Sequence, residues 1–248
     1  MFFLKLTILG CHGPYPPAGG ACSGYLLEHE NNFILLDCGN GVLSKLQYHI
    51  EINRLTAVFV SHLHSDHMAD LLIMRYALQI DLEQGKRSTA LKIFTPAEPA
   101  AELERLSYKE VYEIETIEEN AFEFASLKFS FTKTAHPVSC YAMRIEKPEG
   151  KAFVYSADTA FFPGIIPFAE AADLFLCEAN FLQADLEANI PHYHLSASQA
   201  AGIAREAGVQ RLLLTHLPPH RKIGSYLAEA QTVFPKAALA EEGKSYSI

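Results

Sequence analysis

The pattern of apolar and polar residues predicts a strand-rich start to the chain. Apolar positions alternate with polar ones over residues 4–8, which is the period of a half-buried strand. A loop rich in glycine and proline follows over residues 10–20, and apolar runs at 25–29 and 33–37 indicate two further strands. Together these segments predict a strand meander.

Beyond this meander the pattern changes to an alternation of helices and strands. We expect a helix over 41–50, a strand over 55–60 and a longer helix over 66–80, in which apolar residues recur at helical spacing. The stretch 91–157 is mostly extended, and its clearest alternation covers residues 127–132. An antiparallel portion of sheet is therefore expected there.

The last third of the chain predicts two buried strands, at 173–178 and 212–215, on either side of a helix over 196–207. Ser196 and Gln199 have the spacing of a capping box, and Gly208 stands where a helix commonly stops. Strands in two groups, each joined to helices, predict an α/β layered sandwich. Because no repeat or linker divides the sequence, we predict a single domain over residues 1–248.

Composition excludes disordered and membrane-spanning proteins. The chain is 49% hydrophobic and 20% charged, the balance of a globular protein, and its apolar runs are far shorter than the ~20 residues that a bilayer span needs. The first residues lack a signal-peptide cleavage site, and five cysteines occur singly with no disulfide framework. We therefore predict a cytoplasmic protein.

The net charge argues against a wide nucleic-acid surface. Lys and Arg number 20 against 29 Asp and Glu, a formal charge of −9, whereas proteins that embrace nucleic acid are usually basic. A polyanion would have to be held locally.

Histidines gather directly after the predicted strand at 55–60, in the sequence Ser61-His-Leu-His-Ser-Asp-His67. In an extended segment, residues two apart point the same way, so His62 and His64 can bind one cation together. Asp66 and His67 begin the next helix and could serve a second cation. Adjacent imidazoles and a carboxylate have no packing purpose, so we predict a metal site, with Zn²⁺ first and Mn²⁺ or Fe as alternatives.

Further donors follow predicted strands elsewhere: His136, Asp158 and His216. Ligands of α/β proteins gather beyond the carboxyl ends of strands, so these side chains could converge on one site. A single histidine at a strand end is more often a hydrogen-bonded structural residue. The shared position argues for a site more strongly than the residue types do.

These donors occur in the order found in the metallo-β-lactamase superfamily of dinuclear metallohydrolases, which the chain resembles over nearly its whole length: His62, His64, Asp66, His67, His136, Asp158 and His216. The resemblance implies a four-layer αββα sandwich. It also implies the ligand sets. One cation takes the first two histidines and His136, the other takes Asp66, His67 and His216, and Asp158 bridges the two.

The segment His194–His216 is similar to the one before the last ligand in tRNA 3′-processing endonucleases (RNase Z) and related phosphodiesterases. In those relatives the histidine that opens the segment helps to protonate the leaving group, so the resemblance implies this role for His194. The other reading is a surface loop histidine. The glycine-rich loop at 10–20 also resembles this branch, and His12 more often shapes such a loop than reaches the substrate.

Two departures from the tRNA enzymes bear on the substrate. Ser65 stands where those enzymes usually have glycine, and only 22 positions separate His136 from Asp158, where they carry a long arm that grips tRNA. Whether a whole tRNA binds without such an arm is left open. Asp37 has two equal readings, as a residue beside the ligand loop or as a turn aspartate before Gly39.

We therefore expect a hydrolase with two divalent cations, Zn²⁺ before Mn²⁺ or Fe, that cleaves a phosphodiester of a small nucleotide or RNA end through a hydroxide shared by the ions. Asp66 could accept a proton from that water, and His194 would protonate the leaving group. The alternatives are a tRNA 3′-processing endonuclease, a thioester or lactone hydrolase of the glyoxalase II type, and a non-catalytic metal-binding protein. No membrane partner is expected; homodimers are frequent in relatives, so a homodimer is left open.

Overall fold

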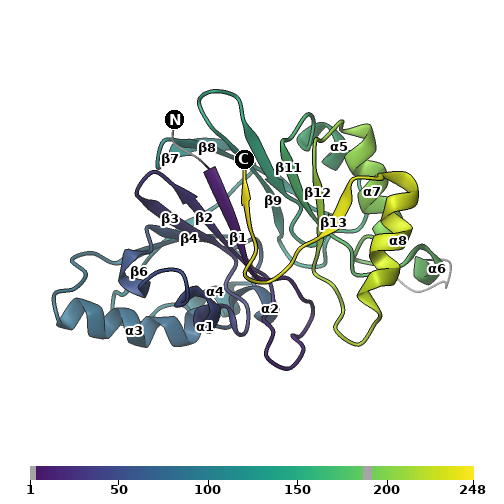
Figure 1. The fold of residues 1–248 in the computed structure, drawn as a ribbon. Coiled ribbons are helices and arrows are strands. Elements are labelled where there is room, and N and C mark those ends of the chain that lie inside the picture. Colours follow the sequence, from purple (N-terminus) through teal and green to yellow (C-terminus); the bar gives the residue numbers. More distant parts are fainter. Residues whose placement is uncertain (1–3, 187–191) are drawn as a thin grey trace. The chain divides into compact units, whose positions relative to one another are not determined.

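The computed structural model describes residues 4–186 and 192–248, and the chain forms two compact units. Unit 1 runs to Ile117 and includes Glu241–Ser247, whereas unit 2 is Glu118–Ala240. Each unit contains one mixed sheet, with seven strands among the described residues, together with helices (Figure 1). The predicted α/β class is confirmed.

The sheet of unit 1 joins the predicted meander to a parallel portion. Its first three strands pair antiparallel, and the following strands continue the sheet in parallel. The strand nearest the end of the chain pairs antiparallel with the first strand. In spatial order the strands are β14 (Ser245–Ser247), β1 (Leu4–Gly10), β2 (Gly24–His29), β3 (Asn32–Leu36), β4 (Ala57–Phe59), β5 (Leu91–Thr95) and β6 (Tyr112–Thr116).

The described helices of unit 1 are shorter than the sequence pattern predicts. They are α1 (Val42–Leu46), the 3₁₀ turn η1 (Ile52–Arg54), α2 (Ser65–Met68), α3 (Leu71–Glu83) and α4 (Ala100–Glu104). The helix expected over 66–80 is divided because Asp70 turns toward the neighbouring segment. Its backbone N donates to the Cys38 carbonyl at 3.0 Å, and its carboxylate accepts from the backbone N of Leu43 at 2.8 Å.

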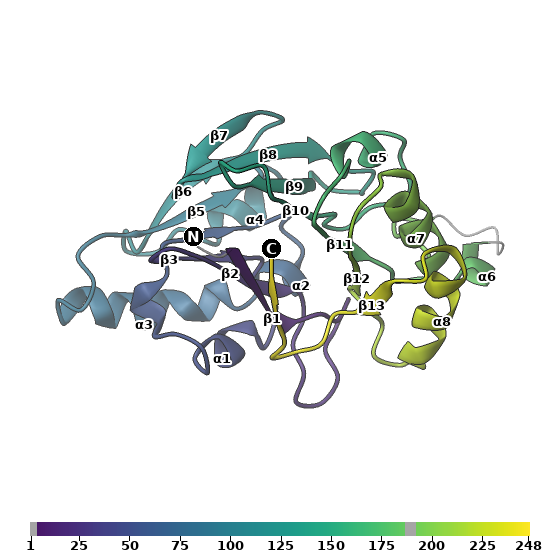
Figure 2. The same cartoon turned by 45° about the horizontal axis from the view of Figure 1, so that its top comes forward.

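Helices α1 and α3 pack against the sheet of unit 1 (Figures 1 and 2). Leu71, Met74 and Leu78 form one buried stripe of α3 and belong to the same buried apolar cluster as Leu35 and Val58 of the strands. Burying a side chain of this size contributes about 1.5–3 kcal/mol relative to leaving it exposed. This core fixes the position of α2 and of the loop between β4 and α2, which together carry the histidine cluster.

The sheet of unit 2 has an antiparallel half and a parallel half. The antiparallel half confirms the antiparallel portion expected within 91–157, although β5 and β6 of the same stretch pair in parallel in unit 1. Every second residue is buried in the first half of the strand at 127–133, which confirms the alternation seen there. In spatial order the strands are β13 (Ala237–Leu239), β12 (Leu212–Thr215), β11 (Leu174–Glu178), β10 (Ala152–Tyr155), β9 (Tyr141–Glu146), β8 (Leu127–Lys133) and β7 (Ala121–Phe124).

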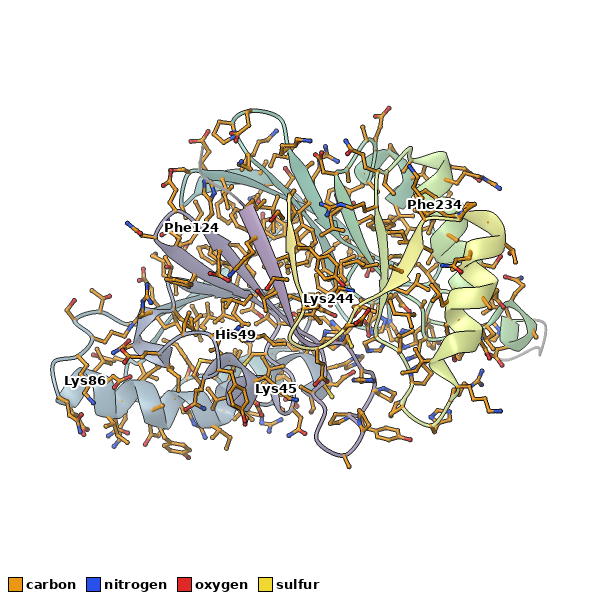
Figure 3. The ribbon with its side chains drawn as sticks, in the orientation of Figure 1. Lys45, His49, Lys86, Phe124, Phe234 and Lys244 are labelled. Carbon is orange, nitrogen blue, oxygen red and sulfur yellow. The ribbon has the colours of Figure 1, made fainter. Side chains whose placement is uncertain are left out.

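The described helices of unit 2 are α5 (Ile165–Phe168), α6 (Gln183–Leu186), α7 (Ala197–Glu206) and α8 (Ile223–Val233). The predicted capping box is present: the backbone N of Gln199 donates to Ser196 Oγ at 3.1 Å, and that of Ser196 donates to Gln199 Oε1 at 3.0 Å. Helices α7 and α8 lie side by side over a shared apolar core (Figures 1 and 2), and Phe234 follows the end of α8 (Figure 3). Within the described ranges, no helix has the length and apolar character of a membrane span.

Candidate metal centre

The histidine cluster of unit 1 presents two pairs of donor atoms. His62 Nε2 lies 3.0 Å from His64 Nδ1, and His67 Nε2 lies 3.6 Å from Asp66 Oδ2. Two ligands of one tetrahedral zinc ion are about 3.3 Å apart, given bonds of about 2.0–2.1 Å. Both pairs therefore fit a divalent cation in chemistry and in spacing.

Asp37 orients this cluster from the end of β3. Its Oδ1 accepts from the backbone N of Ser61 at 2.7 Å, and its Oδ2 accepts from Ser61 Oγ at 2.9 Å and from His67 Nδ1 at 2.7 Å. Because the carboxylate accepts, the proton of His67 sits on Nδ1 and the Nε2 lone pair is left for a cation, as in many metal-binding histidines. Of the two readings of Asp37, the geometry supports the residue beside the ligand loop.

The backbone after Asp37 holds the same loop in place. The backbone N of Cys38 donates to the His67 carbonyl at 2.7 Å. At the next position, a Cβ on Gly39 would lie 1.9 Å from the Asp66 carbonyl oxygen, so only glycine allows this close approach. The short segment 37–39 thus fixes both the side chains and the backbone of the cluster.

Unit 2 brings together the other predicted residues, each beyond a strand or before a helix. His216 Nε2 lies 3.3 Å from Asp158 Oδ2, and His194 Nδ1 lies 3.9 Å from the same oxygen. The ring of His194 stacks on that of His216 at 5.2 Å between centroids and meets the edge of the His136 ring at 5.6 Å. Imidazole and carboxylate again form a donor set suited to a divalent cation.

Backbone contacts orient two histidines of unit 2. Nδ1 of His136 lies 3.4 Å from the Tyr193 carbonyl, which can only accept, so the ring proton sits on Nδ1 and Nε2 carries the lone pair that can bind a cation. His216 adopts a positive φ of 56°, and Asn180 Nδ2 donates to its carbonyl at 2.9 Å. Sequence reasoning missed Asn180, and an amide after a buried strand gave little signal for this role.

Glu178 was also missed. This fully buried carboxylate ends β11, and its Oε1 lies 2.9 Å from His194 Nδ1 and accepts from the backbone N of Thr159 at 2.7 Å. Its Oε2 accepts from the backbone N of Leu195 at 3.2 Å. Its position in the sequence could have identified it. Glu178 is the last residue of an otherwise apolar strand, and the predicted donors His136, Asp158 and His216 also follow strands.

A third donor cluster, in unit 1, has a structural explanation. Donor atoms of Cys11, His12 and Glu242 lie within 4.8 Å of one another. Burial, followed by the charge of Glu242, raises the pKa of the Cys11 thiol to about 12, which disfavours the thiolate that binds metal. Glu242 is already paired with Lys45 at 2.8 Å and accepts from the backbone N of Ala21 at 2.7 Å. This cluster links the segment around Glu242 to the glycine-rich loop.

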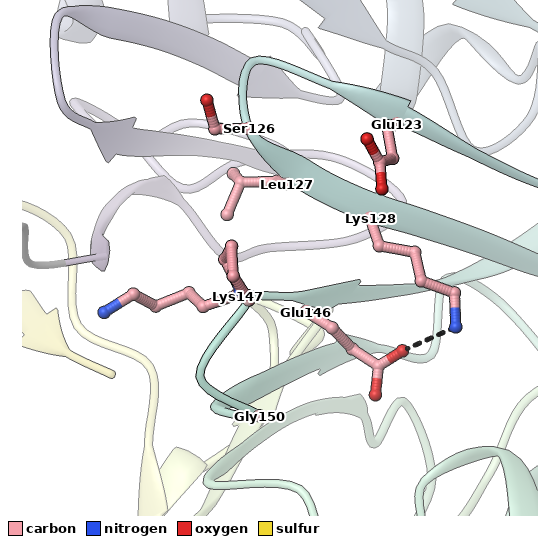
Figure 4. A pocket seen from close by; sticks show the side chains of 8 residues that line it. Glu123, Ser126, Leu127, Lys128, Glu146, Lys147 and Gly150 are labelled. Atoms are coloured by element: carbon pink, nitrogen blue, oxygen red, sulfur yellow. Dashed lines mark ion pairs between the residues drawn. The ribbon is translucent and has the colours of Figure 1, made fainter.

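A pocket of about 500 Å³ in unit 2 lies away from these donors. It is lined by residues of the β7–β8 and β9–β10 turns, where Lys128 and Glu146 form an ion pair at 3.4 Å (Figure 4). His136 and Asp158 follow the opposite ends of β8 and β10. The pocket is therefore separate from the candidate metal centre.

A known family matches the region that contains these donors. The sequence profile of the β-lactamase superfamily domain matches residues 32–217, which is three quarters of the chain. The chain belongs to the β-lactamase superfamily. The matched range includes all seven predicted metal ligands.

A relative of similar length supports this assignment. The chain is 38% identical to the probable metallo-hydrolase YhfI of Bacillus subtilis, over 93% of this chain and 94% of the relative. The crystal structure of YhfI, described as a metallo-β-lactamase fold protein, matches with a TM-score of 0.94 and 35% identity over 99% of this chain and 100% of that one. The predicted metallo-β-lactamase fold is confirmed, and the family supports a hydrolase that binds divalent metal.

The resemblance to RNase Z is also confirmed. The chain is 26% identical to the ribonuclease Z of Chlamydia pneumoniae, over 98% of this chain and 95% of the relative. The crystal structure of human tRNase Z, short form, shares the fold with a TM-score of 0.77 at 23% identity, over 98% of this chain and 99% of that one.

Proposed function

We propose that the donors of the two units act together and that the whole chain is one hydrolase domain. One divalent cation would take His62, His64 and His136, and the second would take Asp66, His67 and His216. Asp158 would bridge them. The assignment rests on the family and on the hydrogen bonds inside each unit that place the protons of His67 and His136 on Nδ1, so that Nε2 carries the lone pair of each ring. Zn²⁺ suits this donor set, and Mn²⁺ or Fe could replace it.

We further propose that the chain hydrolyses phosphodiesters. The observation that carries this proposal is the pair of His194 and Glu178 beside Asp158. The carboxylate keeps a proton on His194 Nδ1, so Nε2 is the atom that would hold a proton and deliver it to a departing alkoxide. An alkoxide is a poor leaving group, and a phosphodiester of a nucleotide needs this help.

The cations and Asp66 would complete the chemistry. Bound divalent ions neutralise phosphate oxygens and lower the pKa of water. Asp66, besides binding metal, would accept a proton from that water. Local positive charge at the site would allow a protein with a net charge of −9 to bind an anionic ester.

A small nucleotide or an RNA end is favoured over a whole tRNA. The match to ribonuclease Z runs over 298 positions, whereas this chain has 248 residues, so at least 50 positions of the relative's alignment have no counterpart here. Between His136 and Asp158 the chain forms only β9, β10 and their turn. These 22 positions leave no room for an arm that could grip tRNA.

The test compares two leaving groups. A dinucleoside monophosphate releases an alkoxide, whereas bis(p-nitrophenyl) phosphate releases a nitrophenolate that departs without a proton. We expect His194→Ala to retain its metal, to lower kcat on the dinucleotide by about 10²–10⁴-fold, and to affect the nitrophenyl ester far less. His192→Ala is the matched control. Equal activity of His194→Ala and wild type on the dinucleotide would remove His194 from the mechanism.

The same assay separates the alternative functions. Turnover of lactoylglutathione without turnover of either phosphodiester would favour a thioester hydrolase, and turnover of a tRNA precursor alone would favour the tRNA endonuclease. A metal-loaded protein that is inert toward the whole panel would favour a metal-binding role.

We also propose a cytoplasmic location, which the five buried thiols outside any disulfide support. A homodimer stays a prediction for size-exclusion measurements.

A further inference from the structure

We propose that Phe161 and Tyr193 contact one nucleobase of the substrate beside the donors of unit 2. This inference rests on the proposed phosphodiesterase function and narrows its substrate class. The substrate would be a phosphodiester that carries an unpaired base next to the cleaved bond.

Few of the described large apolar side chains of unit 2 are exposed, and Phe161 and Tyr193 are among them. In the described part of unit 2, Phe161 and Tyr193 are the only large apolar side chains that are exposed, at 47% and 48%. Isolated exposed apolar residues are ordinary on protein surfaces. Here, however, both occur in segments that carry donors, since Phe161 is three residues beyond Asp158 and Tyr193 directly precedes His194.

Both segments adjoin the strand end that carries His136. On one side, the backbone N of Ala160 donates to the Ala135 carbonyl at 3.0 Å, which places the Phe161 backbone next to this strand end. On the other side, the Tyr193 carbonyl lies 3.4 Å from His136 Nδ1. Two aromatic residues from separate parts of the chain therefore flank one proposed metal ligand.

The buried carboxylate of Glu178 fixes both segments. Oε1 accepts from the backbone N of Thr159, two residues before Phe161, at 2.7 Å. Oε2 accepts from the backbone N of Leu195, two residues after Tyr193, at 3.2 Å. Thr159 is also tied to the neighbouring strand end, because its Oγ1 accepts from the backbone N of Ala135 at 3.1 Å. The two aromatic side chains are thus carried by anchored backbone.

Stacking is a suitable way for this protein to hold a nucleotide. Every base offers a π face, and removing one aromatic partner typically weakens single-stranded nucleotide binding by about fivefold or more. The contact needs no positive charge, which suits a chain of net charge −9. Metal ions would bind the phosphate, and the aromatic side chains would select an ester with a base.

Binding of two phosphates that differ only by a base tests this inference without turnover. We would titrate metal-loaded protein with adenosine 5′-monophosphate and with ribose 5-phosphate in a calorimeter. Wild type should bind adenosine 5′-monophosphate more tightly than ribose 5-phosphate, by about fivefold or more. Phe161→Ala and Tyr193→Ala should each weaken binding of the nucleotide by about fivefold or more and leave that of the sugar phosphate unchanged, whereas Tyr193→Phe should behave as wild type.

The matched control is Tyr48→Ala, because Tyr48 is an aromatic side chain of unit 1 that is 83% exposed. This variant should bind both ligands as wild type does. Equal affinity of wild type for the two ligands would overturn the inference, and so would variants of Phe161 and Tyr193 that lose affinity for both ligands to the same extent.

Turnover distinguishes failure of this inference from failure of the proposed function. Thymidine 5′-p-nitrophenyl phosphate carries a base and methyl p-nitrophenyl phosphate does not. Phe161→Ala and Tyr193→Ala should each raise KM for the thymidine ester and leave KM for the methyl ester unchanged. If neither ester is hydrolysed by wild type, the phosphodiesterase function itself is wrong. If both are hydrolysed and the variants leave the ratio of the two KM values unchanged, only the role of the aromatic residues is wrong.

Discussion

The two units hold their donors in contrasting ways. In unit 1, all the predicted ligands lie within the one short segment 62–67, between β4 and the start of α3. In unit 2, the ligands come from the ends of different strands, and His136 and His216 are 80 positions apart with several elements between them. A local motif can be recognised from spacing alone, whereas a dispersed set depends on how the strands are ordered in the sheet.

Despite this difference, each unit uses one fully buried carboxylate to organise its donors. Asp37 binds His67 and the backbone of Ser61, and Glu178 binds His194 and the backbone N of Leu195 and Thr159. Both acids end or directly follow a strand. Their proposed roles differ, because Asp37 orients a metal ligand whereas Glu178 orients a proton donor.

The largest expected effect comes from removing a ligand of unit 1. His64→Ala deletes the nitrogen that lies 3.0 Å from His62 Nε2, so a cation would lose one of its closest donors. We expect metal content and turnover to fall together, measured by elemental analysis and by hydrolysis of bis(p-nitrophenyl) phosphate. His49→Ala, an exposed histidine of the same unit, is the control. Unchanged metal content in the His64 variant would contradict the local motif.

A smaller effect is expected when the carboxylate of unit 1 is neutralised. Asp37→Asn removes the charged acceptor of His67 Nδ1, and loss of such a partner typically lowers metal affinity by about 10–100-fold. Competition with a chelator would measure the metal affinity of the variant and of wild type. Asp173→Asn is the matched control, because Asp173 is also a buried carboxylate but pairs with Lys151 in unit 2. Equal metal affinities in the two variants would show that Asp37 has no special role.

Neutralising the carboxylate of unit 2 should lower the turnover number and leave the metal content unchanged. Glu178→Gln leaves His194 in place but removes the charge that holds its proton on Nδ1. We expect kcat for a dinucleotide to fall by about tenfold, part of the 10²–10⁴-fold contribution of a positioned acid. Its pH profile should shift while metal content is kept. Loss of metal with an unchanged pH profile would assign Glu178 the same role as Asp37 and abolish the contrast.

The smallest effect concerns Glu242, which links the last segment of unit 1 to the glycine-rich loop of the same unit. Burial raises the pKa of this carboxyl, but hydrogen bonds from His12, Lys45 and the backbone N of Ala21 outweigh it, and the pKa lies below its usual value of 4.5. The stabilisation is therefore complete above that value and is lost as the pH falls through the lowered pKa.

Thermal unfolding of Glu242→Gln would measure this stabilisation. The variant should unfold at a lower temperature than wild type at pH 7, and the difference should shrink as the pH is lowered below the usual carboxyl range. Glu241→Gln, which removes an exposed partner of Lys244, is the control. A difference that grows toward low pH would contradict the sign of the effect.

Much of the fold could be predicted because burial follows sequence period. The alternation at 127–132 gave β8, and the capping box gave the start of α7. The break between α2 and α3 could not be predicted, because it depends on contacts of Asp70 with residues some 30 positions earlier. The pairing of β14 with β1 likewise depends on residues at opposite ends of the chain.

Some residues of the candidate site could likewise be predicted from the sequence, and others could not. The cluster at 62–67 was visible because its donors are adjacent, and His136, Asp158 and His216 were found through their strand ends and the family resemblance. Asn180 and Glu178 were not found, since their functions depend on which side chains the folded backbone brings near them. Gly39 was noticed only as a turn residue, although the close approach of the Asp66 carbonyl requires it.

The central claim is that donors of both units bind the same pair of cations. Its most direct test is the metal content of His136→Ala beside wild type, measured by elemental analysis after dialysis. We predict about two divalent ions per wild-type chain, as in two-metal hydrolases, and a clear loss in the variant, although every ligand of unit 1 is intact. The same metal content in both proteins would contradict the claim.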